Sequence, residues 1–258
     1  MRRIVLCEGP GDVAALREIA LWVFHAEAQK RNAAAGAAGE EKRQLVRNGA
    51  ALIELIAVAN GKSGLGPTLV TTLKSLPPGN RPDDEAAVES VSVIFDPDTQ
   101  SPGLFCAELS AAVAANASDW TLAGEPGTWV AHRAADEQVT IRAIHWRAPG
   151  AVVDGLPDTQ TLERLLCFVA AQAYPEEALI VERWLGDLTT LGRKVGWKAA
   201  LHLWCGLVEE KASETNAAAK FLHQNRTCAP LVRPIIEQVS LFNDLTPVLG
   251  PDQRAAGL

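Results

Sequence analysis

Two short apolar runs, each ending in acidic residues, constrain the fold of this chain more than any other feature. Residues 3–7 are almost wholly apolar and rich in β-branched side chains, which is typical of a buried strand in a parallel sheet. Glu8 ends this run, and a Gly-Pro-Gly-Asp turn leads into apolar residues at helical spacing. Residues 92–95 repeat the pattern and end in Asp96-Pro97-Asp98. The repeated order of strand, acidic turn and helix predicts an α/β fold built on a mainly parallel sheet flanked by helices.

Other segments in this part of the chain carry weaker signals. Residues 28–46 contain few apolar side chains, so we expect an exposed helix end and a loop there. Residues 77–89 combine prolines with a group of acids, which indicates another loop. Further strands are expected at residues 51–59, 129–131 and 139–146, and helices from the turn at 60–64 to residue 76 and at 102–115.

Helical periodicity dominates after about residue 157. The apolar positions predict helices at residues 162–173, 176–188, 197–210, 217–222 and 232–242. We therefore expect an α/β domain over residues 1–151 and a helical C-terminal portion over residues 152–258 that packs on it.

Charge and apolar patterning limit the class of protein. The formal net charge of −7 argues against a chain that grips nucleic acid by bulk electrostatics, because counterion release requires a basic surface. A local basic strip can still form, since Arg133, Arg142, His145 and Arg147 lie close together in the sequence. We see no signal peptide and no apolar run of the ~20 residues needed to cross a bilayer. We therefore expect a soluble, cytoplasmic protein that does not act at a membrane.

The five cysteines are odd in number, widely separated and mostly set in apolar runs. That usage favours reduced thiols in the core over disulfides or a zinc cluster. The five histidines likewise show no metal-ligand spacing.

The acidic residues after the two apolar runs are the strongest candidates for a functional site. Open parallel sheets place their ligand sites beyond the carboxyl ends of the strands, where Glu8, Asp96 and Asp98 would lie. Asp12 follows Glu8 by one helical turn and can lean back toward the same point. Carboxylate oxygens without sulfur or paired imidazoles suit a hard divalent cation, so we expect Mg²⁺ or Mn²⁺ as the cofactor.

The stretch Ile4-Val5-Leu6-Cys7-Glu8-Gly9-Pro10-Gly11-Asp12-Val13, taken with Ile94-Phe95-Asp96-Pro97-Asp98, resembles the Toprim domain of topoisomerases, primases and overcoming-lysogenization-defect (OLD) nucleases. The resemblance implies that Glu8, Asp96 and Asp98 hold magnesium and promote phosphodiester breakage or joining. Asp12 matches an acidic position found after the glutamate in OLD-type enzymes and primases.

The later stretch Asp158-Thr159-Gln160-Thr161-Leu162-Glu163-Arg164-Leu165-Leu166, taken with Lys198-Ala199-Ala200-Leu201-His202, looks like a smaller group of uncharacterised, OLD-nuclease-like Toprim proteins with a helical C-terminal portion. In such proteins the helical half brings a further acid and a lysine toward the metal face. By this resemblance Glu163 becomes an additional metal ligand, and Lys198 becomes a substrate-binding residue.

Three more cations are candidates for contact with substrate. Gly61-Lys62-Ser63 lacks the earlier glycine of a phosphate-binding P-loop, because Ile56 stands at that position. Lys62 could nevertheless meet a phosphate near the acids. Arg142 and Arg147 flank His145 in a grouping that can touch a nucleic-acid backbone.

Hydrolysis of a phosphodiester by metal-activated water is the reaction we predict, with DNA or RNA as the substrate. A topoisomerase would need a nucleophilic tyrosine, and the chain has only Tyr174, placed in the helical half. The alternative is a non-catalytic Toprim-like module that binds nucleic acid or serves as a regulatory binding module. A phosphoacceptor domain of receiver type is disfavoured, because Ala59-Asn60 ends the middle strand where that class needs an aspartate. No ATPase segment is visible, so a separate protein partner and the oligomeric state are left open.

Overall fold

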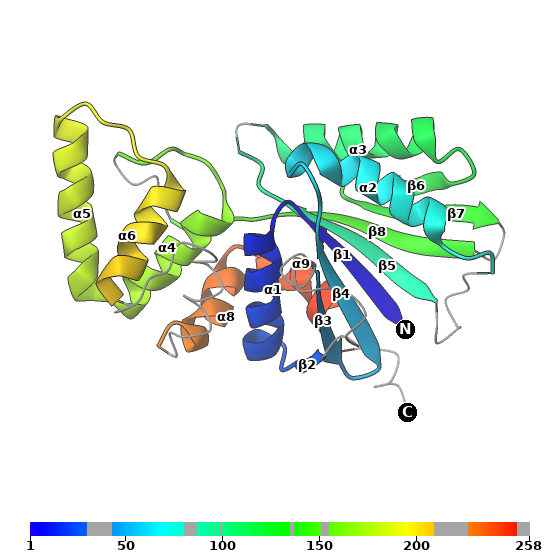
Figure 1. Cartoon of the computed structure of the whole chain (residues 1–258), viewed down its shortest axis with the longest axis horizontal. Helices are drawn as coiled ribbons and strands as arrows, with labels where there is room; N and C mark the ends of the chain where they lie inside the picture. The colour runs from blue at the N-terminus through cyan, green and yellow to red at the C-terminus, as the bar shows by residue number, and fades with distance from the viewer. Residues whose placement is uncertain are drawn as a thin grey trace.

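A single mixed sheet forms the centre of the protein. The computed structural model describes residues 1–29, 43–79, 87–98, 100–134, 137–150, 155–208 and 227–251. Within them the strands follow the order β2-β3-β4-β1-β5-β8-β7-β6 (Figure 1). Their bounds are β1 Arg2–Cys7, β2 Glu27–Gln29, β3 Arg43–Asn48, β4 Ala51–Ala57, β5 Val88–Phe95, β6 Thr121–Glu125, β7 Thr128–Ala134 and β8 Glu137–His145.

The middle of the sheet is parallel and both of its sides are antiparallel. Strands β4, β1, β5 and β8 run parallel to one another. The remaining neighbours, β2 with β3, β3 with β4, β6 with β7 and β7 with β8, are antiparallel. The prediction of a mainly parallel sheet is therefore correct for the centre and wrong for the sheet as a whole. Tight turns produce two of these antiparallel pairings. Gly49 lies between β3 and β4 and Gly127 between β6 and β7, with positive φ angles of 58° and 98°.

The prediction of a helix end and a loop over residues 28–46 is wrong at both ends of that range. Strand β2 begins at Glu27, and strand β3 pairs with β4 from Arg43. These two outer strands are largely exposed or half-exposed and polar, so they lack the apolar run that marks a buried strand. Residues 30–42 lie outside the described part of the chain.

Helices cover both faces of the sheet. Their bounds are α1 Pro10–Val23, α2 Lys62–Ser75, α3 Pro102–Asn116, α4 Leu162–Ala173, α5 Pro175–Thr190, α6 Trp197–Val208, α8 Ala229–Gln238 and α9 Leu241–Leu249. Helices α2 and α3 pack on one face around a core that includes Leu6 and Phe95, whereas α1, α8 and α9 cover the other face. In this second core, side chains of the sheet continue into those of α4 and α6.

The predicted helices are largely present. Helix α4 has the expected bounds, whereas the helix expected at residues 232–242 is two helices, because Ser240 takes a left-handed φ of 61° between α8 and α9. The helix expected at residues 217–222 and the domain boundary near residue 152 both fall outside the described residues. The division into two domains therefore stays a prediction.

The C-terminal helices return to the first strands. Arg3 donates from Nη1 to the Gly250 carbonyl at 2.7 Å, and Asn48 donates from Nδ2 to the Leu249 carbonyl at 2.8 Å. Both donors are buried, so each of these bonds replaces one that water would otherwise supply. They tie the end of α9 to strands β1 and β3.

The thiols and the lengths of the helices complete the description of the fold. All five cysteines are buried and carry free thiols. In the part of the chain that the structure describes, every helix is too short or too polar to cross a membrane.

Candidate metal centre

Glu8 and Asp96 meet at the carboxyl edge of two neighbouring strands. Strands β1 and β5 are parallel, and Cys7 is in register with Ile94, so the residues that follow them emerge side by side. Glu8 accepts a hydrogen bond at Oε1 from the Asp96 amide at 2.8 Å. The predicted convergence of the two acidic turns is therefore present in the fold.

Asp12 is held in the first turn of α1 by two donors. Its Oδ2 accepts from the Gly9 amide at 3.0 Å, which closes a capping interaction at the start of the helix. Its Oδ1 accepts from the indole Nε1 of Trp146 at 2.7 Å. Trp146 lies directly after β8 and is fully buried. The carboxylate of Asp12 is thus fixed from two elements.

Asp96 connects the sheet to the helical part of the chain. Its Oδ1 accepts from the amide of Leu162 at 3.0 Å, at the start of α4. Thr161 caps this helix by accepting from the Arg164 amide at 3.2 Å. Glu163 therefore lies in a helix turn whose backbone contacts Asp96, and its charge acts on both Asp96 and Asp12. Its role as a metal ligand stays a prediction.

Lys62 supports the turn that carries Asp96 and Asp98. Its Nζ donates to the carbonyls of Asp96 and Pro97 at 2.7 and 3.0 Å, and it lies 3.5 Å from Asp98 Oδ2. The aromatic faces of Phe95 and Phe105 are also within 6 Å of this ammonium group, at 5.7 and 5.5 Å from the ring centroids. Asp98 has a left-handed φ of 51° and keeps 55% of its side chain exposed. Lys62 therefore holds a backbone turn, in addition to any contact with substrate.

Burial, and after it mutual repulsion, raises the pKa of three of the acids. Burial, followed by the charges of Asp12 and Asp98, raises the pKa of Glu8 to about 7, although the Asp96 amide and Lys62 act in the opposite direction. Burial raises the pKa of Asp12 to about 6 against the lowering effect of the Trp146 hydrogen bond. Burial, then Asp12, Glu163 and Glu8, raises the pKa of Asp96 to about 8. Negative charge is therefore poorly compensated here, which is the electrostatic setting that a bound cation relieves.

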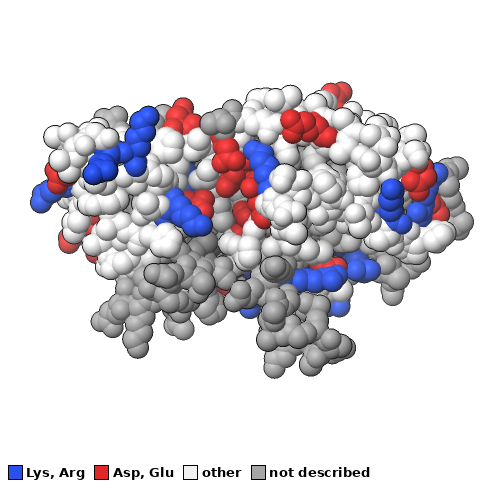
Figure 2. Space-filling model, turned by 45° about the horizontal axis from the view of Figure 1, so that its top comes forward, with Lys and Arg blue, Asp and Glu red and all other residues white. Residues whose placement is uncertain are grey.

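The donor set fits Mg²⁺ or Mn²⁺ by chemistry, because its oxygens are all carboxylate. Among the described residues, however, no three acidic, histidine or cysteine side chains close around a single point. Ion binding would have to draw these carboxylates closer together. Figure 2 shows a group of acidic side chains near the middle of one face of the molecule, next to a basic side chain.

The remaining predicted residues lie elsewhere. Lys198 is exposed in the first turn of α6 and makes no contact with the acids in the described structure. Arg142 and Arg147 line a separate cavity of about 380 Å³ at the end of β8, together with His145. Arg147 forms an ion pair with Asp244 of α9.

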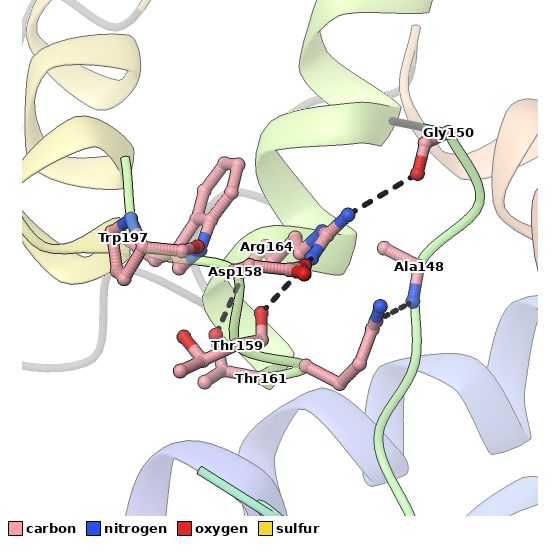
Figure 3. A network of polar contacts seen from close by, with 9 residues as sticks. Ala148, Gly150, Asp158, Thr159, Thr161, Arg164 and Trp197 are labelled. Carbon is pink, nitrogen blue, oxygen red and sulfur yellow. Dashed lines mark hydrogen bonds and ion pairs between the residues drawn. The ribbon is translucent and has the colours of Figure 1, made fainter. Parts of the chain in front are cut away.

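A buried arginine next to the acidic centre was not anticipated from the sequence. Arg164 is 3% exposed and donates to Asp158 Oδ1 at 3.0 Å, the Thr159 carbonyl at 3.3 Å and the Gly150 carbonyl at 3.2 Å (Figure 3). Its guanidinium also lies over the ring of Trp197, 5.5 Å from the centroid. These contacts hold the segment that leads into α4, and with it the amide that binds Asp96. Only the Thr161 helix cap had a recognisable sequence signal.

The fold and the acidic centre together define a mixed α/β protein with carboxylates gathered at the ends of parallel strands. No protein-family model matches the sequence, and no curated protein is similar to it at the level of sequence. The crystal structure of a hypothetical protein from Pyrococcus horikoshii is similar over 97% of this chain and 100% of that one, with a TM-score of 0.68 and 17% identity. This likeness shows that the two chains share a fold.

Proposed function

We propose that this chain is a Toprim-type, Mg²⁺- or Mn²⁺-dependent enzyme that hydrolyses phosphodiester bonds in DNA or RNA. The observation that carries the proposal is the hydrogen bond from the Asp96 amide to Glu8, because it joins the acidic turns of two strands at one edge of the sheet. Asp12 and Glu163 bring further negative charge to the same edge.

The acids differ in what they can contribute. Glu8 has a pKa of about 7, so near neutral pH it can hold or release a proton beside a reacting group. Asp12 and Asp96 are oriented by hydrogen bonds and would act as ligands once ion binding draws the carboxylates together. Asp98 is the most exposed of the group, so it is the acid most accessible to a substrate. A divalent cation held there would polarise a phosphoryl oxygen and lower the pKa of nearby water.

A non-catalytic Toprim-like binding or regulatory module is the second candidate. Two observations favour it: the described acids do not close around one point, and the net charge of −7 disfavours a strong general grip on nucleic acid. Such a module would keep the fold and bind an ion or a strand without cutting it.

Cleavage assays separate these two functions. The full chain is incubated with supercoiled plasmid and with single-stranded DNA and RNA in Mn²⁺, and compared with Glu8→Gln and Glu108→Gln. Glu108 is an exposed glutamate of α3 and serves as the matched control. We expect cleavage by the wild type and by Glu108→Gln, and loss of at least ~100-fold in Glu8→Gln. Metal binding without cleavage of any substrate would favour the binding module.

A further inference from the structure

The cavity lined by Arg142 and Arg147 lies where strand β8 is no longer paired with β7. The register of β7 with β8 begins at Thr128 and Arg142, so β8 has no strand partner on this side beyond Arg142. The start of α3 and the middle of α9 flank the open edge, and a cavity of about 380 Å³ fills the space between them. This volume lies within the range of small-ligand sites, about 300–1,000 Å³.

The cavity carries an excess of positive charge. Arg142 and Arg147 both line it, and among the residues that the structure describes Arg142 has no ion pair. The nearby carboxylate of Glu89 is already paired with Arg3 at 2.9 Å. Asp244 is the acid that lines the cavity, and it pairs with Arg147. Two guanidinium groups thus face one carboxylate.

Arg147 has an unused donor at this site. Its Nε is buried and has no hydrogen-bond acceptor in the described structure, although its Nη2 contacts Asp244. Asp244 keeps 41% of its side chain exposed, so it can turn away into solvent when another anion enters. A buried donor without an acceptor costs free energy, so a turn of the Arg147 side chain that brings Nε to an oxyanion in the cavity would be favourable.

The start of α3 adds to the preference for an anion. Pro102 and Gly103 line the cavity, and the first turn of this helix contains no acidic residue. The amide groups and the dipole at a helix N-terminus favour negative charge. Guanidinium groups and helix amides together are well suited to the tetrahedral oxygens of phosphate.

We propose that this cavity binds a phosphate group through Arg142 and Arg147. The inference rests on the proposed function and deepens it, because it assigns a place to a second phosphate of the substrate. Phe95 lines the cavity and is followed directly by Asp96, so the cavity and the acidic centre both adjoin the end of β5. The strand would then be held by one phosphate while a neighbouring one is exposed to the acids.

Binding is measured on the full chain in EDTA, so that no divalent cation contributes. Inorganic phosphate is titrated by calorimetry, and a short fluorescein-labelled oligothymidylate is titrated by anisotropy. We expect Arg142→Gln to weaken both by roughly 10–100-fold, the effect of losing one charge-assisted hydrogen bond. The control is Arg233→Gln on α8, which removes an equal charge from an exposed ion pair with Glu237, and neither residue of that pair lines the cavity. Equal affinities for Arg142→Gln and Arg233→Gln, or no phosphate binding by the wild type, would overturn the proposal.

A second variant covers the case in which Arg142→Gln does not fold. Asp244→Asn frees Arg147 from its ion pair, so phosphate should bind several-fold more tightly than to the wild type. Unchanged or weaker phosphate binding by folded Asp244→Asn would remove Arg147 from the site and contradict the proposal.

Competition identifies the source of the phosphate. Displacement of the oligothymidylate by inorganic phosphate from the wild type places a strand phosphate in the cavity. Phosphate binding that leaves the oligonucleotide in place indicates a free phosphate or a small phosphorylated ligand. Cleavage that is absent while phosphate binding persists would remove only the proposed function. If the wild type cleaves its substrate but Arg142→Gln does not change phosphate binding, only this inference fails.

Discussion

The indole Nε1 of Trp146 donates a hydrogen bond of 2.7 Å to Asp12, although 134 residues separate the two in the sequence. Both residues are buried, and the bond connects the end of β8 to the first turn of α1. It lowers the pKa of a carboxylate that burial would otherwise raise further. The position of Asp12 therefore depends on a side chain from the far side of β5.

Removal of this donor should destabilise the protein. We expect Trp146→Phe to lower the free energy of unfolding at pH 8 by about 1–3 kcal/mol beyond its packing loss, because the ionised Asp12 is left without its donor. Trp120→Phe is the matched control, since Trp120 is equally buried and its Nε1 has no acceptor in the described structure. Urea denaturation measures both variants, and equal losses would show that the bond to Asp12 contributes nothing.

Stability of the metal-free protein should decline as the pH rises. The pKa values of Glu8, Asp12 and Asp96 in the folded protein are about 7, 6 and 8, above their ordinary values of 4.5, 3.8 and 3.8. Between these limits the folded state binds more protons than the unfolded state, so the free energy of unfolding falls with increasing pH. The contribution of the three acids is full below about pH 4 and is lost by about pH 8.

Urea denaturation in EDTA from about pH 5 to pH 8 measures this decline. Burial lowers the pKa of His145, which acts in the opposite direction, so the wild type is compared with Glu8→Gln. The variant lacks one of the titrating acids and should show a shallower decline. A slope equal to that of the wild type would mean that Glu8 does not titrate as described.

Divalent cations should stabilise the folded protein through Asp96. We expect Mn²⁺ at about 100 times its Kd to raise the free energy of unfolding of the wild type by about 2.7 kcal/mol. In Asp96→Asn that gain should be largely lost, because the side chain keeps its size but not its charge. Thermal unfolding with and without Mn²⁺ gives the measurement, and Asp119→Asn, at an exposed aspartate after α3, is the control. A gain that survives in Asp96→Asn would exclude this carboxylate as a ligand.

The buried guanidinium of Arg164 should be important for stability. Arg164→Met leaves the carbonyls of Gly150 and Thr159 without this donor, so we expect a loss of about 2–4 kcal/mol in the free energy of unfolding. Arg233→Met breaks an exposed ion pair and the contact of this guanidinium with the Phe242 ring, and should cost only about 1 kcal/mol. Chemical denaturation compares the two variants. Similar small losses would show that the network in Figure 3 has little energetic weight.

Lys62 should maintain the geometry of the Asp96-Pro97-Asp98 turn. In Lys62→Met two backbone carbonyls lose their donor, and the pKa of Glu8 should rise above about 7 because a lowering charge is gone. Titration of the glutamate carboxyls by NMR measures this shift. Lys74→Met, at an exposed lysine of α2, should leave the pKa of Glu8 unchanged. An unchanged pKa in Lys62→Met as well would contradict the described contact.

The parts of the fold that depend on local pattern could be predicted from the sequence. An apolar run followed by an acid places Glu8 and Asp96 at strand ends, and parallel pairing then brings them together. The antiparallel edges could not be predicted in the same way. Strand β3 is polar and half-exposed, and its pairing depends on a tight turn at Gly49.

Long-range side-chain contacts could not be predicted from the sequence either. The bond between Trp146 and Asp12 and the contacts of Arg164 with Gly150 and Trp197 join segments that show no shared periodicity. Lys198, which the family resemblance suggested, lies on an exposed helix turn away from the acids. Its expected place depended on how α6 packs, and a helical pattern alone does not specify that packing.

The attachment of α9 to strands β1 and β3 has a consequence for synthesis of the chain. Arg3 and Asn48 belong to β1 and β3, yet their buried donors find acceptors at Gly250 and Leu249, after α9. During translation the strands β1 and β3 and helix α1 are made first, so the part of the sheet face that α9 covers stays exposed until α9 has left the ribosome. A nascent chain of this protein must therefore protect that apolar part of the sheet from aggregation while all the residues between β4 and α9 are being added.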